Sequence, residues 1–212
     1  MARKKPNTAV ASPYSVHPGV AMVAKWAGEL PEKTGRSLDD WVSLLEKDGP
    51  KTDKERRDWL KSRHKFGTNA AWWIVERAAK GDGWEDGDPA AYLKAAAAYV
   101  ETMYAGPKAG LRPLHDRLIA AGRGLGPDVR VCPCKTIVPF YRTNVFAQIK
   151  PATRTRLDFG LSLRGVPAAG RLLSTGGEAK GDRITHRIAV SSEADIDEFL
   201  ERWLREAYER AE

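Results

Sequence analysis

The spacing of the apolar residues changes once along the chain, close to Val129. Before this point apolar residues recur every three or four positions, as Val23, Trp26 and Leu30 do, which is the spacing of one face of a helix. After it they alternate, as in residues 157–163, where every second residue is Leu or Phe. This change predicts an α+β protein whose antiparallel sheet has one buried and one exposed face.

Prolines, glycines and the apolar spacing divide the chain into four expected parts. Residues 1–18 lack periodicity and contain three prolines, which predicts a flexible tail. Residues 19–81 are expected to form a domain of four short helices, because four amphipathic stretches follow one another there. The glycine- and aspartate-rich residues 82–88 are expected to be a linker to an α+β domain over residues 89–212.

Helix starts in the first domain are marked by capping residues. Ser37 with Asp40, and Thr52 with Glu55, have the spacing of capping boxes, in which a hydroxyl and a carboxylate each satisfy a free backbone amide. The Thr-Asn pair at residues 68–69 is expected to supply the cap of the fourth helix. These signals predict short helices with sharply defined first turns.

The second domain is expected to begin with two helices, which follow Pro89 and Pro107. Strands are expected in IVPFY, NVFAQI, residues 157–163 and residues 183–190. In the last of these, Ile184 and His186 are predicted to face the core with Ile188 and Val190. An amphipathic helix closes the chain, and its apolar stripe is expected to cover the apolar face of the sheet. That stripe comprises Ile196, Phe199, Leu200, Trp203, Leu204, Ala207 and Tyr208.

The formal net charge of +7 is unevenly distributed. Between Ala105 and Val190 there are 15 Lys and Arg against 5 Asp and Glu, a local excess of 10, whereas the residues after Val190 hold 3 against 8. A basic segment followed by an acidic helix indicates a polarised surface that attracts phosphate groups.

The sequence shows no apolar stretch of the kind found in secretory signals and no run of about 18 apolar residues, so a cytoplasmic location is expected. The two cysteines, Cys132 and Cys134, cannot by themselves supply four zinc ligands, and their spacing differs from that of thioredoxin-like sites. We therefore expect ordinary strand or loop residues there, with no bound metal and no cofactor.

Several segments resemble known families. LPEKTGRSLDDWVSLLEKDGP and the helices after it resemble the helical bacterial domain of unknown function numbered 4287. The segments YAGPKAGLRPLHDRLIAAGRGLGPDVRV, KTIVPFYRTNVFAQIKP, RLDFGLSLRGVPAAGRL and EFLERWLREAYERA resemble the domain of unknown function numbered 5655. The resemblance covers residues 20–212 and implies the two-domain architecture, but it implies no activity. The Cys132-Pro-Cys134-Lys135 segment departs from the family pattern. The second half also resembles, at the level of the fold, small α+β proteins suspected of binding DNA.

The exposed face of the predicted sheet is the first candidate binding site. Arg156, Arg164, Arg183 and Arg187 are expected to lie on it around small residues, and an arginine fork suits phosphate or carboxylate. The alternative is that these charges only keep an exposed strand face solvated.

Cations also surround the strand IVPFY. Lys135, Arg142 and Lys150 could follow phosphates while Phe140 or Tyr141 stacks on bases. Period two sends the two aromatic residues to opposite faces, so at least one of them is expected in the core.

Tryptophans suggest a different site. Trp72, Trp73 and Trp84, with Tyr141, could line a small-molecule pocket between the two halves. Adjacent helical residues point about 100° apart, so only one of Trp72 and Trp73 is expected to reach the helical core. Core packing is the alternative for this set.

The histidines do not cluster, and no nucleophile elbow, P-loop or HExxH motif is present. The sequence therefore favours a binding protein without catalytic activity whose sheet face engages an anionic partner such as nucleic acid. The alternative is a protein that binds a small molecule in the tryptophan-lined pocket.

Overall fold

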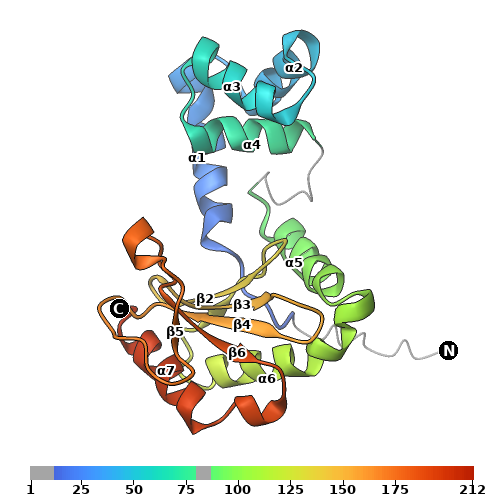
Figure 1. Ribbon diagram of the computed structural model, residues 1–212. Helices are drawn as coiled ribbons and strands as arrows, with labels where there is room; N and C mark the ends of the chain where they lie inside the picture. Colours follow the sequence, from blue (N-terminus) through green and yellow to red (C-terminus); the bar gives the residue numbers. More distant parts are fainter. Residues whose placement is uncertain (1–11, 80–86) are drawn as a thin grey trace, which may run out of the picture. The chain divides into compact units, whose positions relative to one another are not determined.

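The computed structural model describes residues 12–79 and 87–212, which form two compact units (Figure 1). Among the described residues, one unit lies between Val16 and Ala98, and the other combines Tyr99–Glu212 with residues 12–15. The division falls inside helix α5 (Pro89–Met103). Residues 82–86 of the predicted linker lie outside the described residues. None of the described helices is both long enough and apolar enough to span a membrane.

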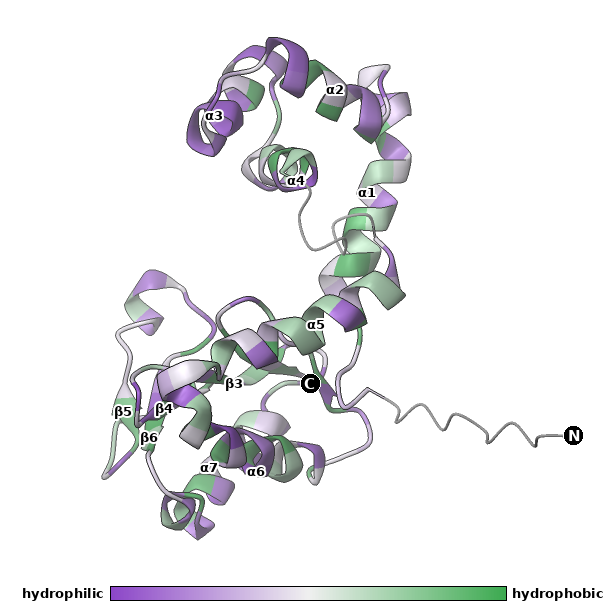
Figure 2. Ribbon diagram, turned by 90° about the vertical axis from the view of Figure 1, so that its right-hand side faces the viewer, coloured by the Kyte–Doolittle hydropathy of each residue, from purple (hydrophilic) through white to green (hydrophobic). Residues whose placement is uncertain are grey.

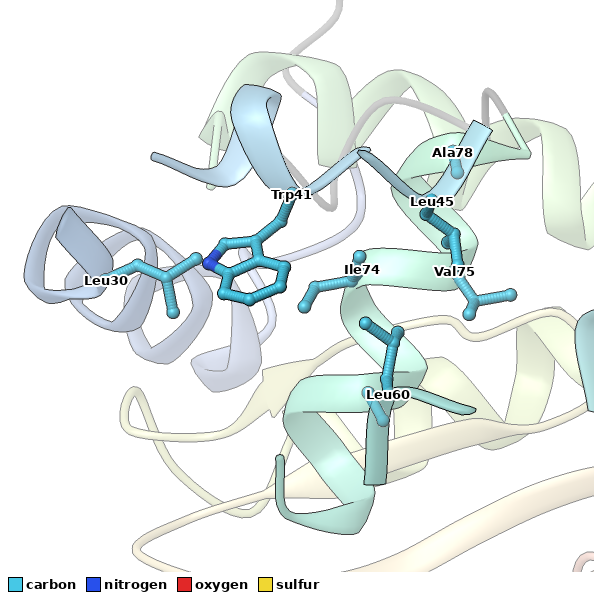
Figure 3. Packing of buried hydrophobic residues seen from close by; sticks show 8 residues of the cluster. Leu30, Trp41, Leu45, Leu60, Ile74, Val75 and Ala78 are labelled. Atoms are coloured by element: carbon cyan, nitrogen blue, oxygen red, sulfur yellow. The ribbon is translucent and has the colours of Figure 1, made fainter. Parts of the chain in front are cut away.

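The helical unit contains α1 (Pro18–Thr34), α2 (Leu38–Asp48), α3 (Asp53–His64) and α4 (Thr68–Ala78). Its core is one cluster to which each of these helices contributes a buried residue (Figure 3). Trp41 lies at the centre of the aromatic part of this core, since its ring is 4.9 Å from those of both His64 and Phe66. The cluster comprises Leu30, Trp41, Leu45, Leu60, Ala71, Ile74, Val75 and Ala78.

Both predicted capping boxes are confirmed. The Asp40 amide donates to Ser37 Oγ at 3.1 Å, and the Ser37 amide donates to the Asp40 carboxylate at 3.0 Å. Thr52 and Glu55 form the same pair of bonds at the start of α3. The prediction for α4 was wrong, because its N-cap is Gly67 and no side chain caps it.

The second unit is built on one antiparallel sheet in the order β1-β2-β3-β4-β6-β5, so the fold is α+β as predicted. Register pairs Phe140 with Ala147, Ala147 with Leu161, and Leu161 with His186, which brings alternate residues of four strands onto one face. The strands are β1 (Arg130–Val131), β2 (Val138–Tyr141), β3 (Val145–Pro151), β4 (Leu157–Leu161), β5 (Leu173–Ser174) and β6 (His186–Val190).

Helices α6 (Arg112–Arg123) and α7 (Glu198–Glu209) lie on the same side of this sheet (Figure 1). The α7 residues Leu200, Leu204 and Ala207 are buried there, which confirms the predicted cover. Helix α6 approaches so closely that a Cβ on Gly122 would lie 2.4 Å from the Phe140 ring. The opposite face of the sheet carries the polar residues.

The alternation predicted for residues 183–190 holds only from His186 onward. Ile184 does not face the core: its methyl group lies over Gly160 on the other side of the sheet, where a Cβ would be only 2.7 Å from it. Thr185 is buried instead of exposed, because its Oγ1 accepts a hydrogen bond from the Leu163 amide at 3.0 Å. The irregular backbone before β6 therefore covers part of the polar face.

Residues 12–15 were predicted to belong to a loose tail, but they lie against the sheet unit. The Ser15 amide donates to the Val131 carbonyl at 2.8 Å, next to edge strand β1, and Tyr14 is buried.

The contact between α6 and the sheet can be tested with matched glycine substitutions. We expect Gly122→Ala to destabilise the protein by about 1–3 kcal/mol, because the added methyl group overlaps the Phe140 ring. Gly110→Ala is the control, since no atom lies within 4 Å of its added Cβ, and we expect a change of about 0.5 kcal/mol or less. Urea unfolding of both variants measures the difference, and equal stabilities would contradict the described packing.

Candidate functional site

A surface groove of about 550 Å³ lies beside the end of β3 in the second unit. Four cations line it: Lys108, Lys135, Lys150 and Arg154. None of its described lining residues is acidic or aromatic, and the remaining ones are small, apolar or hydroxyl-bearing. We call this feature the basic groove.

Each cation of the basic groove comes from a different short segment. Lys108 belongs to the 3₁₀ helix η2 (Gly106–Leu111), and its Nζ donates to the Pro151 carbonyl at 2.9 Å. Lys135 lies in the turn between β1 and β2, which is closed by a bond from the Cys134 amide to the Ile137 carbonyl. Lys150 is the last residue but one of β3, and Arg154 lies in the turn that follows. The groove thus depends on contacts between segments far apart in the sequence.

Two cations of the basic groove have no ion-pair partner within the described part of the chain. Lys150 and Arg154 are exposed, and neither forms an ion pair with any described residue. In β3, Lys150 stands opposite Asp158 of β4. That carboxylate is already engaged by two arginines, since Arg156 Nε lies 3.0 Å from it and Arg187 Nη1 lies 3.2 Å from it. Lys150 and Arg154 therefore keep their positive charge exposed at the groove.

The open face of the sheet differs from the prediction in its charge. The structure brings Arg156 and Arg187 together there, as expected, but both donate to Asp158, which lowers their attraction for a partner. Arg164 and Arg183 are exposed in loops outside the strands, so they are not part of a strand face. Asp158 on this face is therefore surrounded by three cations, namely the two paired arginines and Lys150.

Arg142 takes part in an ion-pair network that involves the C-terminal end of the chain. Its guanidinium pairs with Asp128 at 2.7 Å and Glu212 at 3.2 Å, and it lies 4.5 Å from the centre of the Tyr208 ring. Tyr208 in turn donates to Asp128 at 2.7 Å. This network connects the end of α7 to the sheet. Because the guanidinium already contacts two carboxylates and an aromatic ring, few of its N–H groups remain for a ligand.

The aromatic residues of the predicted pocket are distributed over both units. Trp72 and Trp73 of α4 are each only partly buried, and the Trp73 ring packs against Trp26 at 5.1 Å. Tyr141 belongs to β2 of the second unit, where burial raises the pKa of its hydroxyl to about 12. Trp84 lies outside the described residues. The small-molecule pocket thus stays a prediction.

Models of two known protein families match the chain, one for each half. A family model described as a domain of unknown function (DUF5655) matches residues 100–211, more than half of the chain. The chain belongs to this family. A second domain of unknown function (DUF4287) matches residues 23–80, so the two predicted domains follow each other in the predicted order. No curated protein and no solved structure matches the chain.

Both cysteines of the DUF5655 domain are free thiols on the turn between β1 and β2. Cys132 is completely buried and Cys134 partly so, and burial raises the pKa of Cys132 to about 12 and that of Cys134 to about 11. Among residues 12–79 and 87–212, no group of three or more His, Cys, Asp or Glu is arranged to hold a metal ion.

The DUF5655 domain also buries a histidine. His115 of α6 is fully buried, and its Nδ1 lies 3.0 Å from the Tyr104 hydroxyl. Burial lowers its pKa to about 4, against the pull of the nearby Asp116, and it raises the pKa of Tyr104. Both members of this pair are therefore shielded from solvent.

Sequence reasoning missed Lys108 and Arg154. Lys108 follows Pro107 in the 3₁₀ helix η2, and Arg154 lies in the turn after Pro151. Many other exposed segments of the chain also carry cations, so the charge of these two residues did not distinguish them. The two prolines were the one sequence feature that indicated a restricted backbone at these positions.

The thiols should be unreactive in the folded protein. Because thiolate is the nucleophile and both pKa values lie far above 8, we expect Cys132 and Cys134 to react with a disulfide reagent at pH 8 only on unfolding. The amount of thiol that the reagent releases on reaction with the protein, measured with and without urea, tests this expectation. Rapid reaction of either cysteine in native protein would contradict the described burial.

The buried histidine should make stability depend on pH. Unfolded His115 takes up a proton near pH 6.5, but the folded protein resists this until about pH 4, so stability falls as pH drops between these values. We expect wild type to lose about 3 kcal/mol more than His115→Gln between pH 7.5 and pH 4. Urea unfolding at several pH values measures how the free energy of unfolding of each protein depends on pH. An equal pH dependence of stability in wild type and His115→Gln would contradict the described burial.

Proposed function

We propose that this protein binds nucleic acid without catalysing a reaction and that the basic groove of the DUF5655 domain is its contact surface. The observation that carries the proposal is the convergence of Lys108, Lys135, Lys150 and Arg154 on one groove whose described lining contains no carboxylate. A groove lined by four positive charges attracts a polyanion.

The shape of the surface favours a long anion. Lys150 belongs both to the groove and to the polar face of the sheet, where it stands opposite Asp158 with its two arginines. Positive charge therefore continues from the groove onto the sheet. A nucleic-acid backbone presents regularly spaced phosphates to such a surface, whereas a single small anion would occupy only part of it.

The chemistry of the lining favours phosphates over bases. Proteins that hold single strands use aromatic platforms for stacking, but no described lining residue of the groove is aromatic. Lysine ammonium groups and the Thr136 hydroxyl suit phosphate oxygens. We therefore propose binding that depends strongly on salt and weakly on sequence.

The proposal includes the cytoplasmic location expected from the sequence. Nucleic acid is found there, and the free thiols of Cys132 and Cys134 suit its reducing conditions.

Two variants that each remove four positive charges compare the candidate surfaces. The groove variant carries Lys108→Gln, Lys135→Gln, Lys150→Gln and Arg154→Gln, and the face variant carries Arg156→Gln, Arg164→Gln, Arg183→Gln and Arg187→Gln. Binding to a 20-base-pair DNA duplex is measured by fluorescence anisotropy at several salt concentrations. Each lost phosphate contact should reduce the slope of log K against log salt by about 0.9, so we expect the four substitutions of the groove variant to reduce this slope by up to about 3.6.

We expect the face variant to lose less, because Arg156 and Arg187 are already paired. An equal loss for both variants would show that total charge matters and that the groove does not. Absence of salt-dependent binding by wild type would overturn the proposal. Salt-independent binding of a small molecule that responds to Trp72 or Trp73 substitution would support the pocket predicted from the sequence.

A further inference from the structure

Helix α3 of the helical unit presents a strongly basic surface. It buries one residue, Leu60, and Figure 2 shows its ribbon almost entirely in the colour of hydrophilic residues. Residues 51–65 contain seven Lys and Arg and three Asp and Glu, a difference of +4. The basic groove lies in the other unit, so this surface is a separate feature.

Four of these cations share one stripe. At 100° per residue, Lys54, Arg57 and Lys61 lie within about 60° of one another, and Lys65 follows the last helical residue, about 16 Å from Lys54 along the helix axis. Two carboxylates lie beside them: Asp58 pairs with Lys61 at 2.8 Å, and Asp53 is one helical turn before Arg57. The stripe therefore has four positive charges against two negative charges. We call it the α3 stripe.

Two carboxylates at the start of α3 also serve the helix itself. Glu55 closes the capping box with Thr52, and Asp53 lies in the first turn, where negative charge is favourable. Glu55 lies outside the α3 stripe, so the four cations outnumber the carboxylates beside them by two.

Lys65 has an unusual backbone conformation for a lysine. It is the C-cap of α3 with φ 59°, and among the described residues it alone has positive φ without being glycine. Glycine adopts this conformation without the steric cost that a side chain brings. The position thus keeps a cation at the end of the α3 stripe where glycine would make the fold more stable. Backbone strain of this kind is concentrated at functional sites.

We propose that the α3 stripe is a second contact surface for duplex nucleic acid, where its cations pair with backbone phosphates. Its length of about 16 Å corresponds to about five base pairs at 3.4 Å per step. The stripe contains no aromatic residue for stacking on single-stranded bases, since Trp59 packs against His64 at 4.4 Å. The identity of the partner rests on the proposed function, but the surface does not share a residue with the basic groove.

Variants of the full chain test this surface. The stripe variant carries Lys54→Gln, Arg57→Gln, Lys61→Gln and Lys65→Gln, and the same duplex and salt series are used as for the basic groove. We expect the slope of log K against log salt to fall by up to about 3.6. Lys47→Gln is the control, because Lys47 is exposed on α2 of the same unit outside the stripe, and it should leave the slope unchanged.

Two substitutions at Lys65 separate charge from strain. Lys65→Gly and Lys65→Gln should each reduce the salt slope by about 1, since both remove the same cation. Only Lys65→Gly should raise the melting temperature of the helical unit, by roughly 2–5 °C, because glycine accepts the positive φ. A more stable variant that binds more weakly cannot be explained by loss of folding.

The outcomes distinguish this inference from the proposed function. Unchanged duplex binding by the stripe variant would overturn the inference while leaving the groove intact. Loss of slope in the stripe variant alone would overturn the groove as the contact surface and support the α3 stripe. Losses that add in the combined variant would support both surfaces, and no duplex binding by wild type would overturn both.

Discussion

Burial of one sheet face beneath α6 and α7 is the interaction on which the second unit depends. Phe140 and Phe159 of that face meet edge to face with ring centres 6.1 Å apart, and α7 buries Leu200 and Leu204 against the strands. Because the apolar residues of all four longer strands are used there, the opposite face and its margins remain free for polar side chains. The cations of the basic groove are displayed at such a margin, where they cost no apolar contact.

The parts of the fold that local pattern determines could be predicted from the sequence. Capping boxes at Ser37 and Thr52 involve residues three positions apart, and the stripe of α7 repeats within a single helix. Residues 183–185 differ, since Ile184 is placed by the space that Gly160 leaves on a neighbouring strand and Thr185 by the Leu163 amide. Alternation within one segment contains no information on such partners.

The candidate site was less predictable for the same reason. Strand alternation correctly placed Arg156 and Arg187 on one face, but it could not reveal that both would share Asp158. Lys108 lies 43 residues from Pro151, whose carbonyl it contacts, so the basic groove exists only after the chain has folded. Composition indicated a positive surface, and tertiary contacts decided which cations gather on it.

The two edges of the sheet have a consequence for association between molecules. Beyond β1, the Ser15 amide already occupies the Val131 carbonyl, and at the other edge β5 consists of only two residues. A neighbouring chain that added its own strand would find few free backbone groups in line at either margin. The sheet is thereby protected from the edge-to-edge pairing that leads to aggregation.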